Sequence, residues 1–262
     1  MDLGLHGARV LVTAASRGLG AATARQFSRE GAVVVISSRN LAALQDTASQ
    51  IVEETGNAVF TQACDVTDNA QIEKLVRNAA NMMGGLDIIV TNAGGPPAGN
   101  FDRFDMTVWQ EATQLTLLSA VALIKSALPY LKQSNRAAIL TITSSSAKQP
   151  FDNLILSSTI RPAVVGLTKS LSIELGKDNI RVNSILPGVT DTERIQELTQ
   201  ARAQQNNISI EAAQASMTAD IPLGRMGTPE EFANVAVLMC SPAGGYLNGV
   251  ALPVDGGWIR AT

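Results

Sequence analysis

A short glycine-containing segment near the N-terminus has the residue types that bind phosphate. It lies between a β-branched run and an alanine-rich stretch with helical spacing. At such a junction backbone N–H groups and the helix dipole face an anion, and glycines let a pyrophosphate approach the backbone. We therefore expect a dinucleotide to bind here, at Thr13, Ser16, Arg17, Gly18, Leu19 and Gly20. The alternative is a plain tight turn.

The end of the second expected strand indicates which dinucleotide binds. An acidic residue at this point would bind the ribose 2′-hydroxyl and repel a 2′-phosphate. The chain has Ser37-Ser38-Arg39 instead, and Arg39, helped by Arg17, can pair with a 2′-phosphate through its guanidinium fork. We therefore predict NADP rather than NAD, with Ser38 and Arg39 in the site. Either arginine can equally be a solvated surface residue.

These residues have to be positioned by a chain that alternates strands and helices. The strand-like runs are residues 8–14, 33–37, 58–63, 86–92, 137–143, 180–186 and 250–254, and the helical patterns are residues 19–30, 41–55, 69–83, 107–131, 157–175 and 229–239. Nearly continuous hydrophobic strands separated by helices predict a parallel sheet covered on both faces. We expect a single-domain α/β Rossmann fold over residues 1–262, with a doubly wound parallel sheet of about seven strands. The polar, helix-prone residues 190–225 are expected to form a flap over the substrate.

Composition excludes several other classes of protein. The 262 residues are 45% hydrophobic and 16% charged, with a net charge of −3, so we expect no nucleic-acid or membrane partner. One histidine and two distant cysteines, Cys64 and Cys240, cannot build a metal cage of thiols and imidazoles. No uninterrupted apolar run approaches about 20 residues, and the N-terminus lacks a basic signal-peptide region. A cytoplasmic protein is expected.

In their order along the chain, several motifs resemble those of the short-chain dehydrogenase/reductase family. The family's TGxxxGxG loop matches residues 13–20, with Ala14 in place of its first glycine. Further matches are Cys64-Asp65-Val66, Thr91-Asn92-Ala93-Gly94, Arg181-Val182-Asn183, Pro187-Gly188-Val189-Thr190-Asp191-Thr192 and Val254-Asp255-Gly256-Gly257. The resemblance covers essentially the whole chain and is strongest to bacterial 3-oxoacyl-carrier-protein reductase-like members.

The resemblance implies hydride transfer between a nicotinamide cofactor and a small-molecule carbonyl or secondary alcohol. It assigns adenine contacts to Asp65 and Val66, and further cofactor contacts to Asn92, Ala93, Gly94, Pro187, Gly188, Val189 and Thr192. It also implies a homo-oligomer, a tetramer or dimer, built through residues 107–131, residues 157–175 and the C-terminal strand.

The chain departs from the family at three of its four catalytic positions. Ser144 matches the serine that holds the carbonyl, but Ser157 replaces the tyrosine of YxxxK, Arg161 replaces its lysine, and Thr116 replaces the relay asparagine. Arg161 can still bind the nicotinamide ribose, but a pKa above about 12 prevents it from passing on a proton. Ser157 is a far weaker acid than a phenol.

Another group must therefore supply the proton, if one is supplied at all. Neither Tyr130 nor Tyr246 is expected near the site, whereas Lys148 and Asp152 lie in the loop that should border the nicotinamide. One hypothesis is an enzyme whose proton comes from Lys148, Asp152 or water; solvated loop charges are the simpler interpretation of both residues. The other is an NADP(H)-binding sensor or inactive partner without hydride transfer. Arg194 can meet a substrate carboxylate or phosphate, although a solvated helix face is its simpler interpretation.

Overall fold

The structure is a computed structural model that describes residues 2–260, excluding the side chains of residues 201, 202 and 205. Seven strands in this part of the chain form one parallel sheet in the order β3-β2-β1-β4-β5-β6-β7. They are β1 (Arg9–Thr13), β2 (Val33–Ser38), β3 (Val59–Ala63), β4 (Ile88–Thr91), β5 (Ala138–Ile142), β6 (Arg181–Pro187) and β7 (Ala251–Val254). The predicted Rossmann fold is confirmed.

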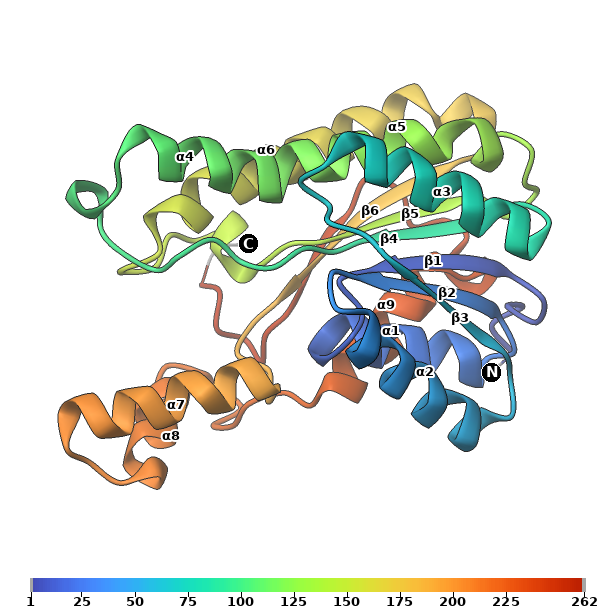
Figure 1. Cartoon of the computed structure of the whole chain (residues 1–262). Helices are drawn as coiled ribbons and strands as arrows, with labels where there is room; N and C mark the ends of the chain where they lie inside the picture. The colour runs from blue at the N-terminus through green and yellow to red at the C-terminus, as the bar shows by residue number, and fades with distance from the viewer. Residues whose placement is uncertain (1, 261–262) are drawn as a thin grey trace.

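Helices cover both faces of the sheet (Figure 1). One face carries α1 (Gly18–Arg29), α2 (Leu41–Thr55) and α9 (Pro229–Cys240), and the other carries α3 (Asn69–Met83), α4 (Met106–Thr113), α5 (Ser119–Leu131) and α6 (Ile155–Glu174). Successive strand residues point to opposite faces, so Val10 and Val12 pack on the first side and Leu11 on the second. Each strand is therefore hydrophobic almost throughout.

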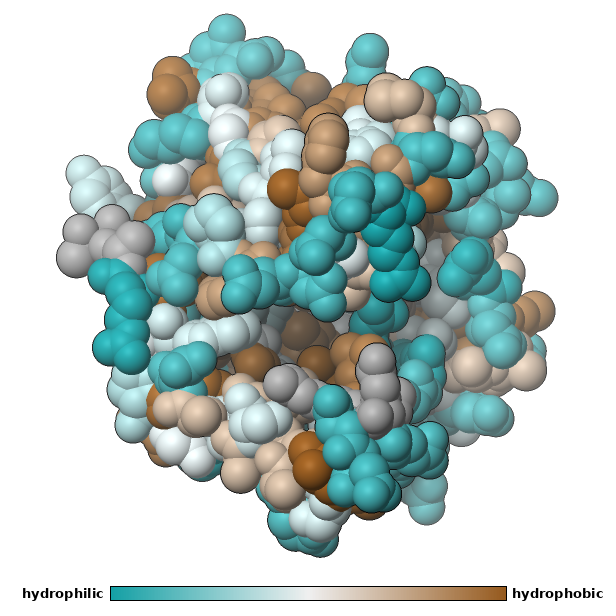
Figure 2. Space-filling model, turned by 90° about the vertical axis from the view of Figure 1, so that its left-hand side faces the viewer, coloured by the Kyte–Doolittle hydropathy of each residue, from teal (hydrophilic) through white to brown (hydrophobic). Residues whose placement is uncertain are grey.

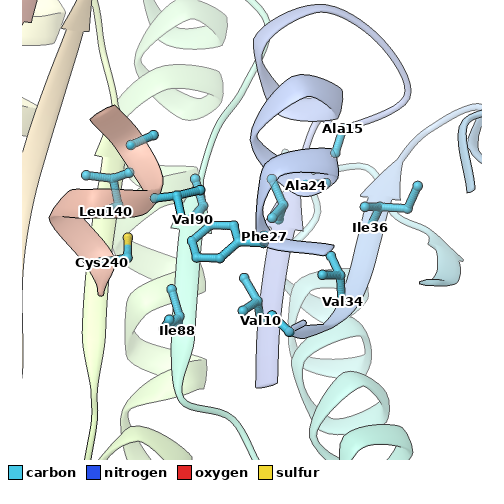
Figure 3. Packing of buried hydrophobic residues seen from close by; sticks show 14 of the residues in the cluster. Val10, Ala15, Ala24, Phe27, Val34, Ile36, Ile88, Val90, Leu140 and Cys240 are labelled. Carbon is cyan, nitrogen blue, oxygen red and sulfur yellow. The ribbon is translucent and has the colours of Figure 1, made fainter. Parts of the chain in front are cut away.

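The core of the first face is built around Phe27 of α1. Its ring is fully buried and lies among Val10, Ile88, Val90 and Leu140 (Figure 3). These side chains come from three neighbouring strands, so the ring fixes α1 over the centre of the sheet. The glycine-containing segment that starts this helix is fixed with it.

The helical stretch Met106–Leu131 contains an interruption. Residues Gln114–Leu118 form a π-helical turn between α4 and α5. By length and composition this stretch is apolar enough to cross a membrane, a test that core helices of globular proteins also pass. Leu123, Ile124, Ala127 and Leu131 of α5 belong to the buried cluster shared with α3 and the sheet. Packing against the core explains the hydrophobicity of α5.

Residues 190–225 contain α7 (Glu193–Asn206) and α8 (Ile210–Thr218), which lie side by side and project away from the sheet (Figure 1). Arg17 beside α1 forms an exposed ion pair with Glu197 of α7, with 3.1 Å between Nη1 and Oε1. Exposed pairs of this kind stabilise weakly, by at most about 1 kcal/mol. The segment is helical in the structure, as its sequence predicts.

Asp87, which directly precedes β4, links chain segments at the amino-terminal ends of the central strands. Its buried carboxylate accepts hydrogen bonds from Arg9 Nε at 2.9 Å, from Arg9 Nη2 at 2.6 Å and from Ser134 Oγ at 2.6 Å. Burial acts to raise the pKa of Asp87, but the hydrogen bonds from Arg9 and Ser134 and the charge of Arg9 outweigh it, so the pKa lies below its ordinary value. The folded state therefore favours the carboxylate.

We predict that Asp87→Asn lowers the free energy of unfolding at neutral pH by about 3 kcal/mol or more, because it leaves Arg9 without its charged partner. A depressed carboxyl pKa stabilises the fold above the ordinary aspartate pKa of about 3.9, and this stabilisation is lost as the pH falls through the lower folded value. Urea unfolding at several pH values should show the gap between wild type and variant closing below about pH 4. The exposed Asp46→Asn serves as control, and a gap independent of pH would contradict the assignment.

Candidate active site

The sheet opens a cleft where β1 lies beside β4. The chain leaves β1 toward β2 and β3, and leaves β4 toward β5, β6 and β7. Crossovers that run in opposite directions leave a crevice at the carboxyl ends of the two strands. A cleft of about 740 Å³ lies at this point. On the side from which α4 and α7 project, the molecular surface is hollowed, with apolar residues in its depth (Figure 2).

A hydroxyl group joins the two strand ends beneath this cleft. Thr13 Oγ1 accepts a hydrogen bond from the backbone N–H of Asn92 at 2.9 Å and donates one to the Asn92 carbonyl at 2.7 Å. The Asn92 side-chain amide donates to the carbonyl oxygen of Ala14 at 3.3 Å. Asn92 thus binds both the end of β1 and the loop that follows it.

The loop after β1 has the close approaches that its glycines predict. Gly18 has a φ of +59° and Ala14, at the position of the family's first glycine, a φ of +48°. This left-handed conformation costs a residue with a Cβ roughly 1 kcal/mol. A Cβ on Gly20 would overlap the carbonyl oxygen of Ala14 and lie 3.0 Å from Ala15 Cα. Only glycine lets α1 begin this close to the strand.

Most of the residues expected to bind a cofactor lie together along the cleft. Those that line it are Ser16, Arg17, Gly18, Leu19, Ser38, Arg39, Asp65, Val66, Asn92, Ala93, Gly94 and Thr192. The other expected residues, Thr13, Gly20, Pro187, Gly188, Val189 and Arg161, are not part of this lining. Thr13 and Gly20 support the loop from below, whereas Gly188 packs on Asp255, since a Cβ there would lie 2.7 Å from Asp255 Cα.

The two arginines at the expected 2′-phosphate position are held differently. Arg39 is exposed at the end of β2 and has no side-chain hydrogen bond or ion pair with any residue in the described part of the chain. Arg17 is bound to Glu197 across the cleft. Arg39 is therefore the cation free to meet an anion at the end of β2.

Ser157 and Arg161, two residues of the altered catalytic motif, form a hydrogen-bonded cluster with Ser146. Arg161 Nε donates to Ser157 Oγ at 3.0 Å, and Arg161 Nη1 donates to the carbonyl of Thr143 at 2.7 Å. Ser157 Oγ also lies 2.8 Å from Ser146 Oγ in a buried contact. Ser144 directly precedes the 3-10 turn that contains Ser146, and its hydroxyl accepts a hydrogen bond from the backbone N–H of Ser146 at 3.2 Å.

Arg161 keeps its positive charge although its surroundings lower its pKa. Burial, and then the nearby charge of Arg194, lower the pKa of Arg161 to about 10. The expectation of a pKa above about 12 was wrong, because it took the value of a solvated guanidinium. Arg161 nevertheless remains protonated at neutral pH and donates through Nε and Nη1.

Thr116 lies in the π-helical turn beside a second, much smaller cavity. Its hydroxyl and that of Thr91 are buried without a hydrogen-bond partner in the described residues. Both line a cavity of about 10 Å³, as does Arg161, which is room for about one water molecule. π-helical turns often occur at functional sites.

The loop that carries Lys148 and Asp152 is held by the C-terminal segment. Phe151 stacks on Trp258 with ring centroids 4.0 Å apart, and Gln149 Oε1 accepts the backbone N–H of Arg260 at 2.9 Å. Lys148 and Asp152 themselves are exposed. Of the two tyrosines, Tyr246 is fully exposed and Tyr130 packs beside α3, and neither lines the cleft.

Sequence reasoning missed Ser146, Thr91 and the Phe151–Trp258 pair. Ser146 lies in the 3-10 turn Ser145–Ala147. Its contact with Ser157 joins the end of β5 to α6, and only the packing of these elements brings the two together. The run of three serines at positions 144–146 was the one available signal in the sequence.

The alternating fold, the switch-point cleft and the phosphate-type loop together define a dinucleotide-binding α/β protein. A family model described as enoyl-(acyl carrier protein) reductase matches residues 13–259. The chain is 31% identical over 262 residues to 7alpha-hydroxysteroid dehydrogenase of Escherichia coli (strain K12), covering 99% of this chain and 97% of that protein. The chain belongs to the short-chain dehydrogenase/reductase family and is an oxidoreductase of that family.

Two solved structures are similar over nearly the full length. L-sorbose reductase from Gluconobacter frateurii, complexed with NADPH and L-sorbose, has a TM-score of 0.96 and 30% identity, with 100% of both chains covered. The NADPH-bound short-chain oxidoreductase from Pseudomonas aeruginosa PAO1, described as containing an atypical catalytic center, has a TM-score of 0.90 and 29% identity, with 98% of this chain and 99% of that chain covered.

We predict that Ser157→Ala destabilises the protein by about 1 to 3 kcal/mol, because it leaves the Nε–H of partly buried Arg161 without its acceptor. Urea unfolding measures this change. Ser158→Ala is a matched control on the same helix turn, since Ser158 Oγ accepts only a long 3.5 Å hydrogen bond from the backbone N–H of Phe151. Equal effects of the two variants would show that the contact between Arg161 and Ser157 contributes nothing.

Proposed function

We propose that the protein is an NADP-dependent oxidoreductase that transfers hydride between the nicotinamide and a small-molecule carbonyl or secondary alcohol. The observation that carries the choice of cofactor is Arg39, a cation at the end of β2 that has no ion-pair partner among the described residues. An NAD site has a carboxylate at this point. Two solved relatives of the same fold contain NADPH, which supports this choice.

The cleft fits a dinucleotide in shape and in donors. The loop Ser16–Leu19 presents the N-terminus of α1 to an anion, and Gly20 keeps this helix close enough for backbone N–H groups to reach a pyrophosphate. Arg39 and Ser38 would hold the 2′-phosphate, while Asp65 and Val66 would border the adenine. Asn92–Gly94, Pro187–Val189 and Thr192 would hold the nicotinamide end. When bound, the nicotinamide supplies or accepts the hydride.

The residues beside the nicotinamide end can bind and polarise a carbonyl. Ser144, half-buried at the end of β5, would donate its hydroxyl proton to the carbonyl oxygen. Arg161 would bind the nicotinamide ribose, and its positive charge favours negative charge developing on that oxygen. Ser157 stays an alcohol that accepts from Arg161, so the proton would come from Lys148, Asp152 or water reaching the open cleft.

The proposal also covers the domain organisation of the chain and its cellular compartment. We expect one domain over residues 1–262, in which α7 and α8 act as a substrate flap. We also expect the protein to be cytoplasmic.

An apolar groove of about 1450 Å³ runs along α4 and exposes Phe101 and Met106. Together with exposed Ile173 on α6, it favours a homo-oligomer built through these helices. Light scattering would test this assembly.

The decisive experiment is NADPH oxidation by the purified protein with a panel of ketones, aldehydes, quinones and 3-oxoacyl thioesters, with calorimetry of NADPH binding in parallel. We expect turnover, and we expect Ser144→Ala to lower kcat by about a hundredfold because the donor to the carbonyl oxygen is lost. NADPH binding without turnover on any substrate would favour the other hypothesis, a sensor or inactive partner.

We predict that Arg39→Ala weakens NADPH binding by about tenfold to a hundredfold and changes NADH binding by less than about threefold, because only NADPH has the 2′-phosphate. Calorimetry with both cofactors measures the two affinities. Arg77→Ala, which removes an exposed charge on α3 outside the cleft, is the control. An equal loss of both cofactors would place the 2′-phosphate elsewhere.

A further inference from the structure

Two guanidinium groups meet beside Gly95, directly beyond the Asn92–Gly94 segment. A Cβ on Gly95 would lie 3.8 Å from Arg161 Nη2 and 4.0 Å from Arg194 Nη2. One arginine comes from α6 and the other from the first turn of α7, so the two approach Gly95 from different elements. Because Gly95 has no side chain, the space between the two charges stays open to the cleft that Gly95 and Arg194 line.

No carboxylate in the described part of the chain balances these charges. Neither Arg161 nor Arg194 takes part in an ion pair. Arg161 uses Nε for Ser157 and Nη1 for the Thr143 carbonyl, which leaves both protons of Nη2 available. The charge of Arg194 also contributes to lowering the pKa of Arg161. An anion placed between the two arginines would remove this repulsion.

The start of α7 separates this position from the phosphate loop. Glu193, the neighbour of Arg194, directs its carboxylate toward that loop, since Oε2 lies 3.9 Å from where a Cβ on Gly18 would stand. The helix thus presents a negative charge to the expected pyrophosphate site and a positive charge to Gly95. This arrangement favours a second anion, distinct from the pyrophosphate, beside Arg194.

We propose that Arg161 and Arg194 bind the carboxylate of an oxo-acid or hydroxy-acid substrate whose reacting oxygen is held by Ser144. The inference deepens the proposed function and rests on it. Arg161 Nη1 donates to the carbonyl of Thr143, the residue directly before Ser144, so the guanidinium lies close to the serine that would hold the carbonyl. This favours substrates in which the carboxylate and the carbonyl are close, as in 2-oxo and 3-oxo acids. One proton of Arg161 Nη2 serves the carboxylate and the other a ribose hydroxyl.

The reaction balances with the cofactor already proposed. In the reducing direction the carbonyl carbon gains a hydride from NADPH, and the π pair of the C=O bond moves to oxygen. The oxygen takes a proton that comes ultimately from solvent, and NADPH becomes NADP⁺. The carboxylate is unchanged, and its charge stays paired with the two arginines throughout.

Binding in dead-end complexes tests this assignment without requiring turnover. Calorimetry with saturating NADP⁺ would compare pyruvate with pyruvamide, and 3-oxobutanoate with 3-oxobutanamide. We expect at least one acid to bind wild type at least about tenfold more tightly than its amide. Arg194→Met should reduce this preference by about tenfold or more, and Arg194→Lys should restore part of it. Arg77→Met is the control for loss of a remote charge.

Three results would overturn the proposal. The first is equal binding of each acid and its amide to wild type. The second is an acid preference that Arg194→Met leaves intact. The third is a loss of NADP⁺ affinity of about tenfold in Arg194→Met without a change in acid preference, which would assign the pair to a cofactor phosphate. Selective acid binding with no NADPH oxidation on any substrate would instead support the carboxylate site and contradict the proposed oxidoreductase function.

Discussion

The candidate site depends on the hydrogen bonds that the hydroxyl group of Thr13 makes with the backbone of Asn92. This hydroxyl group satisfies the backbone N–H and C=O of Asn92, and so joins the carboxyl ends of β1 and β4 where their crossovers diverge. No helix can cover that junction, so a cleft has to open there. Asn92 in turn holds the carbonyl of Ala14, and α1 starts against the same backbone because residue 20 is glycine. The phosphate-type loop and the segment after β4 therefore keep fixed positions relative to each other.

The change from the family's tyrosine and lysine to Ser157 and Arg161 produces a different network. The guanidinium reaches two acceptors in different directions, Ser157 Oγ and the Thr143 carbonyl, and this geometry uses the planar fork that a lysine lacks. Ser146 completes the cluster from the other side. A positive charge remains at position 161, while the acidic phenol of the family's tyrosine is absent. In the proposed mechanism, ribose binding and charge stabilisation by Arg161 are separate from proton supply, which comes from a different group.

The sequence predicted the fold well because its signals are local. The bounds of α2 and α3 were predicted to the residue, since Asn40 and Asp68 cap their starts and Gly56 and Gly84 end them in left-handed conformations. The π-helical turn at Gln114–Leu118 was not predicted, because an extra residue in one helical turn leaves no compositional trace. Ser146 and the Arg17–Glu197 pair depend on chain segments distant in sequence, so local patterns contain no information about them. The pKa of Arg161 was missed for the same reason, as its burial comes from packing.

The cations of the cleft form two groups that act independently. Arg39 stands at the end of β2, whereas Arg161 is bound to Thr143 just beyond β5, three strands away in the sheet order. Three strand spacings are roughly 14 Å, which exceeds the screening length of about 8 Å at physiological ionic strength. An anion at one end therefore changes affinity at the other only weakly through charge. Substitutions at the Arg161 end of the site therefore leave the positive charge that Arg39 presents at the end of β2 almost unaffected, so the two ends of the proposed cofactor site can change separately.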